Sequence, residues 1–301
     1  MENPIVITGA SGFVGRKLAV KLRDAGFEVT ALDVNDPKID GVNFINTDIS
    51  QEMVIDKKKI PKSASFIHLA ALSTDGQCKA NPKQALETNL VGTARVIELA
   101  TEKEATKFVF ASSEWVYPER TDDVLQQETE FLKLESLNSL YAMTKLMGEN
   151  LIRATCSVPT VILRFGIVYG PRPKPGSAPE SIALQVSRGE VVKIGAGTTS
   201  RRFIYVEDLI EGIHKAVKSS KNVAYQVFNL SGDQLLSLAE IIEASMRLTK
   251  RRVQIVDGGF SPSIRNPDPS KFMNEFQFQF EVNIEEGLSR CLKAMGFSYG
   301  D

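Results

Sequence analysis

The sequence predicts a doubly wound α/β fold, in which a parallel sheet carries helices on both faces, together with a smaller C-terminal mixed α/β domain. Short apolar runs that suit buried strands recur along the first half of the chain, at 5–7, 28–32, 42–45, 65–69, 107–111 and 160–164. Segments with helical spacing of apolar residues lie between them, at 12–25, 82–100 and 140–154. The first run also breaks directly into a glycine-rich turn, which is typical of this fold.

Two domains are predicted from the order of these segments and from the length of 301 residues. We expect residues 1–165 to form a dinucleotide-binding domain, to which residues 200–230 return through a helix and a strand. Residues 166–199 and 231–301 are expected to form the substrate-binding domain. The polar, acidic stretch at 119–139 has no clean period and is predicted to be a surface excursion.

The turn that follows the first strand has the glycine spacing of a dinucleotide-binding turn. Gly9 permits the tight turn, Gly12 lets a phosphate approach the backbone, and Gly15 lets the next helix lie against the sheet. A pyrophosphate would lie over the N-terminus of that helix, where unpaired N–H groups and the helix dipole favour an anion. An ordinary strand, turn and helix can show this spacing by chance, so the interpretation depends on context. The other expected cofactor contacts of this turn are Ser11, Phe13 and Val14.

Asp33 supplies that context, because it ends the second predicted strand about 20 residues after the turn. An acid at this point is expected to hold the ribose hydroxyls of an adenosine. The same carboxylate would repel a 2′-phosphate, and the following Val34 and Asn35 supply no cation to attract one. The sequence therefore predicts NAD rather than NADP as the cofactor.

Further candidate cofactor contacts follow the ends of the next strands, where ligands of such sheets collect. Asp48 could accept a hydrogen bond from an adenine amino group and Ile49 could pack on its ring, although an acid in a loop is more often only solvated. The residues that end and follow the strand at 65–69 would pass close under a nucleotide; they are Leu69, Ala70 and Ala71.

Two polar residues lie within apolar segments. His68 falls inside the strand at 65–69 rather than past its end, so we interpret it as structural and not as a base. Asn89 falls on the apolar side of the helix at 82–100. A buried asparagine must find partners, so Asn89 is predicted to bridge neighbouring loops by hydrogen bonds.

Tyr141 and Lys145 are four residues apart at the start of a predicted helix and so share one of its faces. A free tyrosine titrates near 10, but a lysine ammonium and a pyridinium ring nearby would both favour the phenolate. Tyr141 could then act as a general acid and base near neutral pH. In isolation the pair would more often be an ordinary surface pair.

Charge and composition exclude several classes of function. The net charge of −1 and the pI near 6.3 provide no basic excess to attract nucleic acid or an anionic membrane. Apolar stretches are interrupted well before the length of about 18 residues that a membrane helix needs, and the N-terminus lacks the features of a signal peptide. The three cysteines are far apart and have no histidine clusters near them, so we expect no disulfide, no metal site and a cytoplasmic protein.

Several motifs together resemble the extended short-chain dehydrogenase/reductase family, especially its nucleotide-sugar epimerases and dehydratases. They are TGASGFVG, HLAA, FVFASSEWVY, YAMTK and LRFGIVYGPR, in this order, and the resemblance covers residues 4–292. It implies a Rossmann domain and a catalytic triad of Ser113, Tyr141 and Lys145, with Ser113 three residues before Val116. The cofactor contacts that it further implies are Asn89, Ser112, Tyr141, Lys145, Phe165 and Val168.

The resemblance also implies where a substrate binds. Arg201 and Arg265 match arginines that contact a diphosphate, and a guanidinium offers a planar fork to its oxygens. Outside this family either arginine would more often form a surface ion pair. The other expected substrate contacts are Ser73, Ser113, Glu114, Trp115 and Arg172.

Three features depart from the family pattern. Ile167 stands where the family usually carries an asparagine that reaches the substrate, and the interval after Arg265 is short. In the dehydratases an Asp-Glu pair follows the triad hydroxyl, whereas this chain has Glu114 and Trp115 there. The base of that reaction is therefore missing, and 4,6-dehydration is not expected.

The function predicted from these residues is epimerisation of a nucleotide-diphosphate sugar at C4 through a transient ketone, with NAD as the cofactor. A 4-keto-sugar nucleotide reductase would use the same groups once per turnover. A dinucleotide-sensing protein without activity could share the fold, but it would not need all three triad residues. The resemblance also suggests a homodimer that pairs the helices at 82–100 and 140–154.

Overall fold

The computed structural model describes residues 3–219 and 224–297 and divides into two compact units. Unit 1 comprises Met1–Val116, Phe131–Arg164 and Gly212–Phe228, and unit 2 comprises Tyr117–Glu130, Phe165–Glu211 and Asn229–Asp301. The domain limits expected from the sequence remain a prediction. Of the residues in those domains, 1–2, 220–223 and 298–301 lie outside the described part of the chain.

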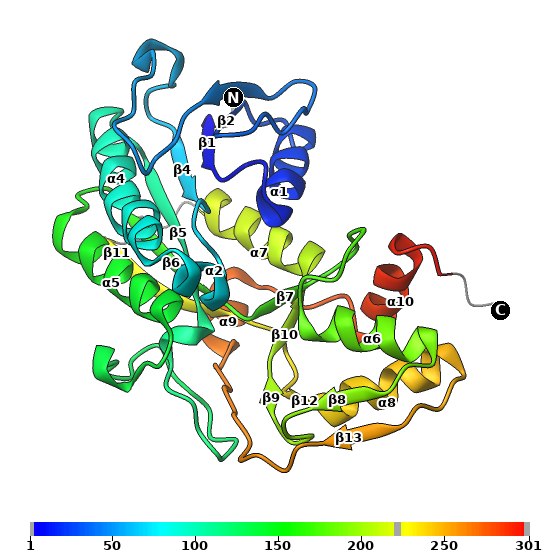
Figure 1. Cartoon of the computed structure of the whole chain (residues 1–301). Coiled ribbons are helices and arrows are strands. Elements are labelled where there is room, and N and C mark those ends of the chain that lie inside the picture. The colour runs from blue at the N-terminus through cyan, green and yellow to red at the C-terminus, as the bar shows by residue number, and fades with distance from the viewer. Residues whose placement is uncertain (1–2, 220–223, 298–301) are drawn as a thin grey trace. The chain divides into compact units, whose positions relative to one another are not determined.

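The predicted doubly wound parallel sheet is confirmed (Figure 1). In the described part of the chain it has seven strands in the order β11-β6-β5-β4-β1-β2-β3, and β1 pairs in parallel with both β2 and β4. The order reverses direction at β1, so the turn after β1 lies at the point where such sheets bind their ligands. The strands of this sheet are β1 (Ile5–Thr8), β2 (Val29–Asp33), β3 (Asn43–Asn46), β4 (Ser65–His68), β5 (Lys107–Ser113), β6 (Thr160–Phe165) and β11 (Tyr225–Leu230).

Helices lie between most successive strands of this sheet, as expected for parallel connections, although β3 follows β2 without one. The α-helices are α1 (Phe13–Asp24), α2 (Asp75–Ala80), α3 (Pro82–Leu86), α4 (Gly92–Glu102), α5 (Leu140–Thr155), α6 (Ala178–Arg188), α7 (Val206–Lys218), α8 (Leu238–Thr249), α9 (Ser270–Phe276) and α10 (Ile284–Ala294). Short helical turns are η1 (Lys57–Lys59), η2 (Glu87–Val91), η3 (Glu114–Val116) and η4 (Leu134–Ser136).

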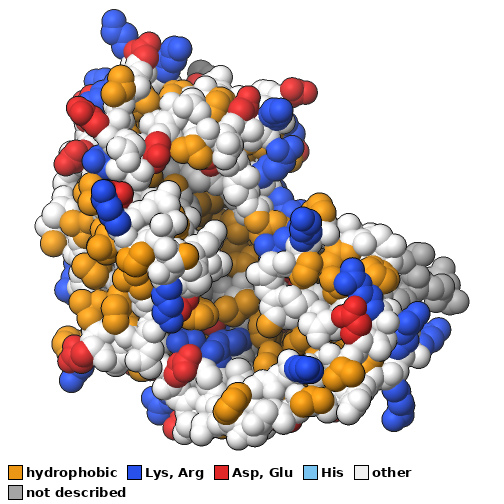
Figure 2. Space-filling model, viewed as in Figure 1, with side chains coloured by type: hydrophobic (Ala, Val, Ile, Leu, Met, Phe, Trp, Pro, Cys, Tyr) orange, Lys and Arg blue, Asp and Glu red, His pale blue; other side chains and the backbone are white. Residues whose placement is uncertain are grey.

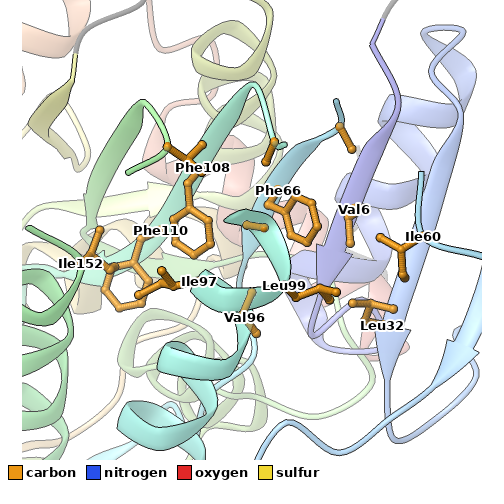
Figure 3. Packing of buried hydrophobic residues seen from close by; sticks show 14 of the residues in the cluster. Val6, Leu32, Ile60, Phe66, Val96, Ile97, Leu99, Phe108, Phe110 and Ile152 are labelled. Carbon is orange, nitrogen blue, oxygen red and sulfur yellow. The ribbon is translucent and has the colours of Figure 1, made fainter. Parts of the chain in front are cut away.

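The core of unit 1 forms where α4 and α5 cover one face of the sheet (Figure 3). Alternate strand residues point to this face, because successive side chains of a strand lie on opposite sides. Val96, Ile97 and Leu99 of α4 and Ile152 of α5 pack there, and each is at most 4% exposed. The strand residues of this core that Figure 3 labels are Val6, Leu32, Phe66, Phe108 and Phe110.

The helix predicted at 82–100 is interrupted, which periodicity did not show. It consists of α3 and α4 with the π-helical turn η2 between them, where the N–H of Gly92 donates to the carbonyl of Glu87. Asn89 lies in this turn and is 3% exposed. A π turn widens the helix by one residue and is found frequently at functional sites.

In its described residues, unit 2 contains three two-stranded sheets and the helices α6, α8 and α10, which contact one another. Its core includes Ile182 of α6, Ile241 and Ile242 of α8 and Cys291 of α10. The sequence Ser237-Leu238-Ala239-Glu240 predicts a capping box at the start of α8, and the structure confirms it, since Ser237 and Glu240 exchange side-chain and backbone hydrogen bonds. The remaining strands are β7 (Ile167–Tyr169), β8 (Val192–Ile194), β9 (Ser200–Arg201), β10 (Phe203–Tyr205), β12 (Leu236–Ser237) and β13 (Ile255–Asp257).

Two local predictions were wrong. The sequence predicts that Asp208 caps a helix at 209–218, but Asp208 lies within α7, and its carboxylate accepts hydrogen bonds from the N–H groups of Glu281 and Val282. Part of the predicted surface excursion is anchored instead: Gln126 is fully buried, and its N–H donates to the carbonyl of Asn266 at 2.8 Å.

Across residues 3–219 and 224–297, the structure contains no helix with the length and apolar character needed to span a membrane.

Candidate active site

The end of β5 and the start of α5 bring the three predicted catalytic residues together in unit 1. Ser113 is the last residue of β5, and α5 contacts both β5 and the turn η3 that follows it. The hydroxyl of Ser139 caps α5 by accepting a hydrogen bond from the N–H of Ala142. This cap starts the helix just before Tyr141, so Tyr141 and Lys145 lie one turn apart on it.

Lys145 is buried, and its ammonium group has defined partners. Nζ donates to the carbonyl oxygen of Ala111 at 2.7 Å and lies 5.0 Å from the centroid of the Phe110 ring. Its distance to the centroid of the Tyr141 ring is 5.9 Å. Burial lowers the pKa of Lys145 to about 8, because the charged form has lost its water.

Tyr141 is hydrogen-bonded to the side chain of Ser113, which favours the phenolate. Burial has the larger effect and raises the pKa of Tyr141 to about 12, and the nearby Glu114 adds to the increase. We expected Lys145 to lower this pKa toward neutral. In this chain alone the pKa is raised instead, because desolvation of the phenolate is the largest effect.

Trp115 and Glu114 lie beside the triad in different environments. The N–H of Trp115 donates to the Ser113 hydroxyl at 3.2 Å, and its ring meets that of Tyr141 edge to face at 6.3 Å between centroids. Trp115 is partly exposed, whereas Glu114 is fully buried. Trp115 can therefore contact a substrate as predicted, while the burial of Glu114 weighs against a direct contact.

The glycine turn after β1 is closely packed, which fits a bound dinucleotide. Gly9 has φ of +74°, and a Cβ there would come within 2.7 Å of the N atom of Ala70. A Cβ on Gly15 would lie 2.1 Å from the carbonyl oxygen of Gly9. Side chains at either position would fill the space between the turn, α1 and the end of β4. Gly12 is exposed at the N-terminus of α1, where an anion would lie.

Asp33 lies at the end of β2 beside this turn. One carboxylate oxygen accepts a hydrogen bond from the N–H of Ser11 at 2.9 Å, and the other accepts one from the N–H of Asn35 at 3.0 Å. The acid is therefore held in a fixed position next to the glycines. Its position fits the predicted role of holding the ribose hydroxyls of NAD.

Two residues expected to contact the adenine differ in exposure. Asp48 is exposed, and its carboxylate accepts a hydrogen bond from the N–H of Ser50. Ile49 is 5% exposed and belongs to the core, where its side chain lies against Gly92. This burial weighs against packing of Ile49 on an adenine ring.

The other expected cofactor and substrate contacts of unit 1 lie near the sheet edge. Leu69, Ala70 and Ala71 follow β4 and are partly exposed, as is Phe13, with Val14, in the first turn of α1. Ser73 is exposed. Ser112 is buried, and its hydroxyl donates to Glu149 rather than to the open edge. In unit 2, Phe165 and Val168 are both partly exposed.

His68 is structural, and its hydrogen bonds fix its tautomer. The hydroxyl of Thr93 donates its proton to the carbonyl of Asn89 at 2.7 Å, so it accepts from His68 Nε2, 2.9 Å away. The other nitrogen, Nδ1, then accepts from the hydroxyl of Thr8 at 2.6 Å. Burial lowers the pKa of His68 to about 3, so the ring is neutral at physiological pH.

Asn89 continues this network to the catalytic helix. Its amide group exchanges two hydrogen bonds with the backbone of Leu72, and Nδ2 also donates to the hydroxyl of Thr144 at 3.0 Å. Thr144 in turn donates to the carbonyl of Tyr141 at 2.8 Å. The predicted bridging of neighbouring loops is confirmed, and the chain of bonds runs from β1 to the first turn of α5.

A buried ion pair holds a later turn of α5, and the sequence analysis missed it. Arg164 of β6 donates two hydrogen bonds to the carboxylate of Glu149, at 3.0 and 2.8 Å, and both side chains are about 5% exposed or less. Glu149 is one turn after Lys145 on the same helix face. That spacing was the available signal, but it did not identify Arg164 as the partner.

The expected diphosphate arginines, Arg201 and Arg265, come together in unit 2. Arg265 is 5% exposed, and one of its nitrogens lies 3.1 Å from the carboxylate of Glu119. Arg201 lies 3.7 Å from the same oxygen and donates to Ser263. Arg172 instead forms a forked pair with the buried carboxylate of Glu180, with its closest contact at 2.7 Å. This pair engages Nε and Nη2 of Arg172.

Comparison with known proteins places these features in context. The profile of the NAD dependent epimerase/dehydratase family matches residues 5–231. The chain is 27% identical over 314 residues to the UDP-glucuronate 4-epimerase of Thermodesulfobacterium geofontis, covering 95% of this chain and 94% of that protein. It is 26% identical over 316 residues to the UDP-N-acetyl-alpha-D-glucosaminuronate decarboxylase of Bacillus cytotoxicus, covering 97% of this chain and 98% of that protein.

A solved structure extends the similarity to the fold. The UDP-glucuronic acid 4-epimerase from Bacillus cereus, in complex with UDP-glucuronic acid and NAD, superposes with a TM-score of 0.84 at 25% identity. The alignment covers 97% of this chain and 99% of that one.

Proposed function

The chain belongs to the NAD dependent epimerase/dehydratase family, and we propose that it epimerises a UDP-sugar at C4 with NAD as its cofactor. The observation that carries this proposal is the group of Ser113, Tyr141 and Lys145. A tyrosine that is hydrogen-bonded to a hydroxyl and has an ammonium beside it can, as its phenolate, take a proton from a sugar hydroxyl and, as the phenol so formed, return it.

The residues of the chain have separate roles in this reaction. NAD, when bound, supplies a hydride acceptor that becomes the donor in the reverse direction. Tyr141 takes the proton of the 4-hydroxyl as the carbonyl forms and gives it back after the sugar ring has turned. Ser113 donates a hydrogen bond to the developing carbonyl oxygen. Lys145 would hold the ribose of the nicotinamide, and its charge would add to that of the bound pyridinium ring in favouring the phenolate.

Trp115 favours epimerisation over reactions that need a second base. A base in its place would be required to remove a proton from a ring carbon, and an indole cannot do so. The similarity to a decarboxylase makes decarboxylation the reaction to distinguish from epimerisation. The intact triad weighs against a sensor without activity, and a 4-keto-sugar reductase remains the alternative that uses the same groups.

Product analysis tests the proposal. The purified protein is incubated separately with UDP-glucuronic acid, UDP-glucose and UDP-N-acetylglucosamine, and the products are separated by chromatography. We expect at least one substrate to reach an equilibrium mixture with its 4-epimer, and the Tyr141→Phe variant to form none. Release of carbon dioxide from the glucuronic acid would show a decarboxylase instead. Net consumption of NADH with a keto-sugar would show a reductase.

The proposal includes a homodimer and a cytoplasmic location. Apolar side chains that are exposed on α3, η2 and α5 support the dimer: Leu86, Val91 and Met147. Figure 2 shows hydrophobic side chains on the outer surface on the side where Figure 1 places α4 and α5.

The cysteines support the proposed cytoplasmic location. Cys78, Cys156 and Cys291 are free, which suits a reducing compartment.

A further inference from the structure

Glu119 lies between Arg201 and Arg265, the two arginines that the family resemblance leads us to expect at a diphosphate. Its Oε1 atom is 3.1 Å from Nη2 of Arg265 and 3.7 Å from Nη2 of Arg201. All three residues belong to unit 2. One carboxylate oxygen therefore meets both guanidinium groups.

Backbone bridges hold these three residues side by side. Ile264 and Arg120 exchange two hydrogen bonds, at 3.0 and 2.9 Å. Ser200 accepts a hydrogen bond from the N–H of Arg265 at 3.3 Å, and its own N–H donates to the carbonyl of Ser263 at 3.1 Å. Glu119, Arg201 and Arg265 each directly follow or precede a bridged residue, so the fold itself sets their meeting point.

The two arginines are fixed by bonds that do not involve Glu119. Nε of Arg265 donates to the carbonyl of Tyr117 at 3.1 Å. Arg201 donates to the carbonyl oxygens of Ser200 and Ser263 and to the Ser263 hydroxyl, at 2.8, 2.5 and 2.7 Å. The side chains of Arg265 and Arg201 are 6% and 13% exposed, whereas that of Glu119 is 50% exposed. Glu119 is therefore the member of the three that can move into solvent.

We propose that Glu119 is an internal counter-ion that occupies the anion position between Arg201 and Arg265 and is displaced when a diphosphate binds. This rests on the proposed function, because the UDP-sugar of that reaction carries the diphosphate that the two arginines are expected to contact. A nearly buried guanidinium needs an opposite charge, and Glu119 supplies it in the free protein. A diphosphate has a charged oxygen for each guanidinium group. A ligand with a single carboxylate brings one negative charge, which is no more than Glu119 already supplies. Glu119 thus makes the site selective for diphosphates.

Titration calorimetry with Glu119→Gln tests this role, because glutamine keeps the shape of the side chain and removes its charge. Inorganic pyrophosphate is the first probe, since it needs neither base nor sugar, and UDP and uridine follow. We expect the variant to bind pyrophosphate and UDP about tenfold more tightly, which corresponds to the loss of one repulsive charge at a partly exposed site. Uridine has no phosphate, so its affinity should not change.

Two matched variants serve as controls. Glu285→Gln removes a carboxylate from another arginine pair of unit 2, where Glu285 lies 2.8 Å from Arg247 and both side chains are exposed, so it should leave every affinity unchanged. Glu119→Asp keeps the charge but withdraws it from the arginines, so its affinity for pyrophosphate should lie between those of the wild type and Glu119→Gln.

The outcomes separate this inference from the proposed function. Unchanged or weaker binding of pyrophosphate by Glu119→Gln would overturn the counter-ion role and leave Glu119 as a support that orients the arginines. Unchanged binding after Arg265→Gln would overturn it as well, because the anion site would lie elsewhere. Tighter pyrophosphate binding by Glu119→Gln, in a protein that converts no nucleotide sugar, would uphold the counter-ion and reject the proposed function.

Discussion

Tyr141 shows two opposing effects of a buried site on one phenol. The hydrogen bond from Ser113 favours the phenolate, but burial disfavours any charge and raises the pKa to about 12. Burial also lowers the pKa of Lys145 to about 8, which reduces the charge available to stabilise a phenolate. The protein alone therefore keeps Tyr141 protonated at neutral pH. The positive pyridinium of NAD is the further charge that we expect to lower this pKa in the complex.

Replacing Tyr141 by phenylalanine removes the proton donor and keeps the ring. We expect turnover to fall by about 10² or more, because general acid-base catalysis contributes about that much. Cofactor affinity should change little, since the packing of the ring is retained. The measurements are steady-state kinetics and the NAD content of the purified variant. Turnover equal to that of the wild type would remove Tyr141 from the mechanism.

Asp33 is expected to set the choice of cofactor. The wild type should bind NAD at least about tenfold more tightly than NADP, because the carboxylate repels the 2′-phosphate. Asp33→Asn removes the charge but keeps an oxygen to accept the hydrogen bond from Ser11, so it should narrow the difference without loosening the turn. Asp33→Ala should also narrow the difference in affinity between NAD and NADP, and it should weaken the binding of NAD. Fluorescence titration with both cofactors measures this, and equal affinities in the wild type would contradict the ribose role.

At the scale of elements, the catalytic helix is fixed at two points. The chain of hydrogen bonds through His68, Thr93 and Asn89 reaches the first turn of α5, and the pair of Glu149 with Arg164 holds a later turn. Both connections run to strands of the same sheet. Because buried polar groups are costly when unpaired, the loss of one partner affects the whole connection.

The neutral form of His68 gives this network a pH dependence. Its pKa is about 3 in the folded protein and near 6.5 in an unfolded chain, so the unfolded state binds the proton first as the pH falls. The stability of the wild type must therefore decrease between pH 6.5 and 3. His68→Gln should be less stable than the wild type by about 1–3 kcal/mol at pH 7, since it breaks buried hydrogen bonds. This difference in the free energy of unfolding should shrink toward pH 4. Only the wild type loses stability through protonation of His68, because the variant has no histidine at this position.

Urea unfolding at pH 7, 5.5 and 4 measures this difference. Thr93→Val is the matched control, because it breaks the same network but retains His68. Its stability curve should run parallel to that of the wild type across this range. If the difference in the free energy of unfolding between the wild type and His68→Gln stays constant with pH, the histidine does not titrate as its burial requires.

Strands and helices with strong local patterns could be predicted from the sequence, and features set by distant partners could not. The apolar runs that form β1, β2 and β5 are buried on both faces, so their composition alone identifies them. Asp208 resembles a cap in sequence, but its partners, the N–H groups of Glu281 and Val282, are far along the chain. The position of the carboxylate therefore depends on tertiary structure.

The candidate site shows the same division. The triad and the glycine turn have fixed spacings within single segments, so the sequence indicates them directly. The meeting of Glu119 with Arg201 and Arg265 depends on bridges between three distant segments, and no local pattern contains it. The raised pKa of Tyr141 was missed for a related reason, because burial is a property of the folded site.

For the whole molecule, the π turn has a consequence for assembly. In a π-helical turn residues five apart are hydrogen-bonded neighbours, which favours placing Leu86 and Val91 on one side of the helix. Both are exposed, at 41% and 45%, and α5, which contacts α3 and η2, contributes the exposed Met147. Apolar side chains exposed on neighbouring helices are typical of protein interfaces.

We therefore expect Val91→Asp to convert a dimer into a monomer, because the new charge would be buried without a partner in the interface. Light scattering coupled to size-exclusion chromatography measures the mass. Val54→Asp is the matched control, since Val54 is 91% exposed in a loop of the same unit and the same change there should leave the mass unaltered. A wild type that runs as a monomer at all concentrations would reject the dimer.

The fate of the cofactor through purification distinguishes the two leading reactions. An epimerase restores NAD within every cycle and gains from never releasing it, whereas a reductase must exchange NADH at each turnover. The closely packed glycine turn, the fixed Asp33 and the apolar Trp115 beside Tyr141 favour the first behaviour. We expect protein denatured after purification to release NAD close to one per chain, and undenatured protein to convert UDP-sugars without added cofactor. Protein that is purified without NAD and consumes NADH stoichiometrically with a keto-sugar would establish the reductase instead.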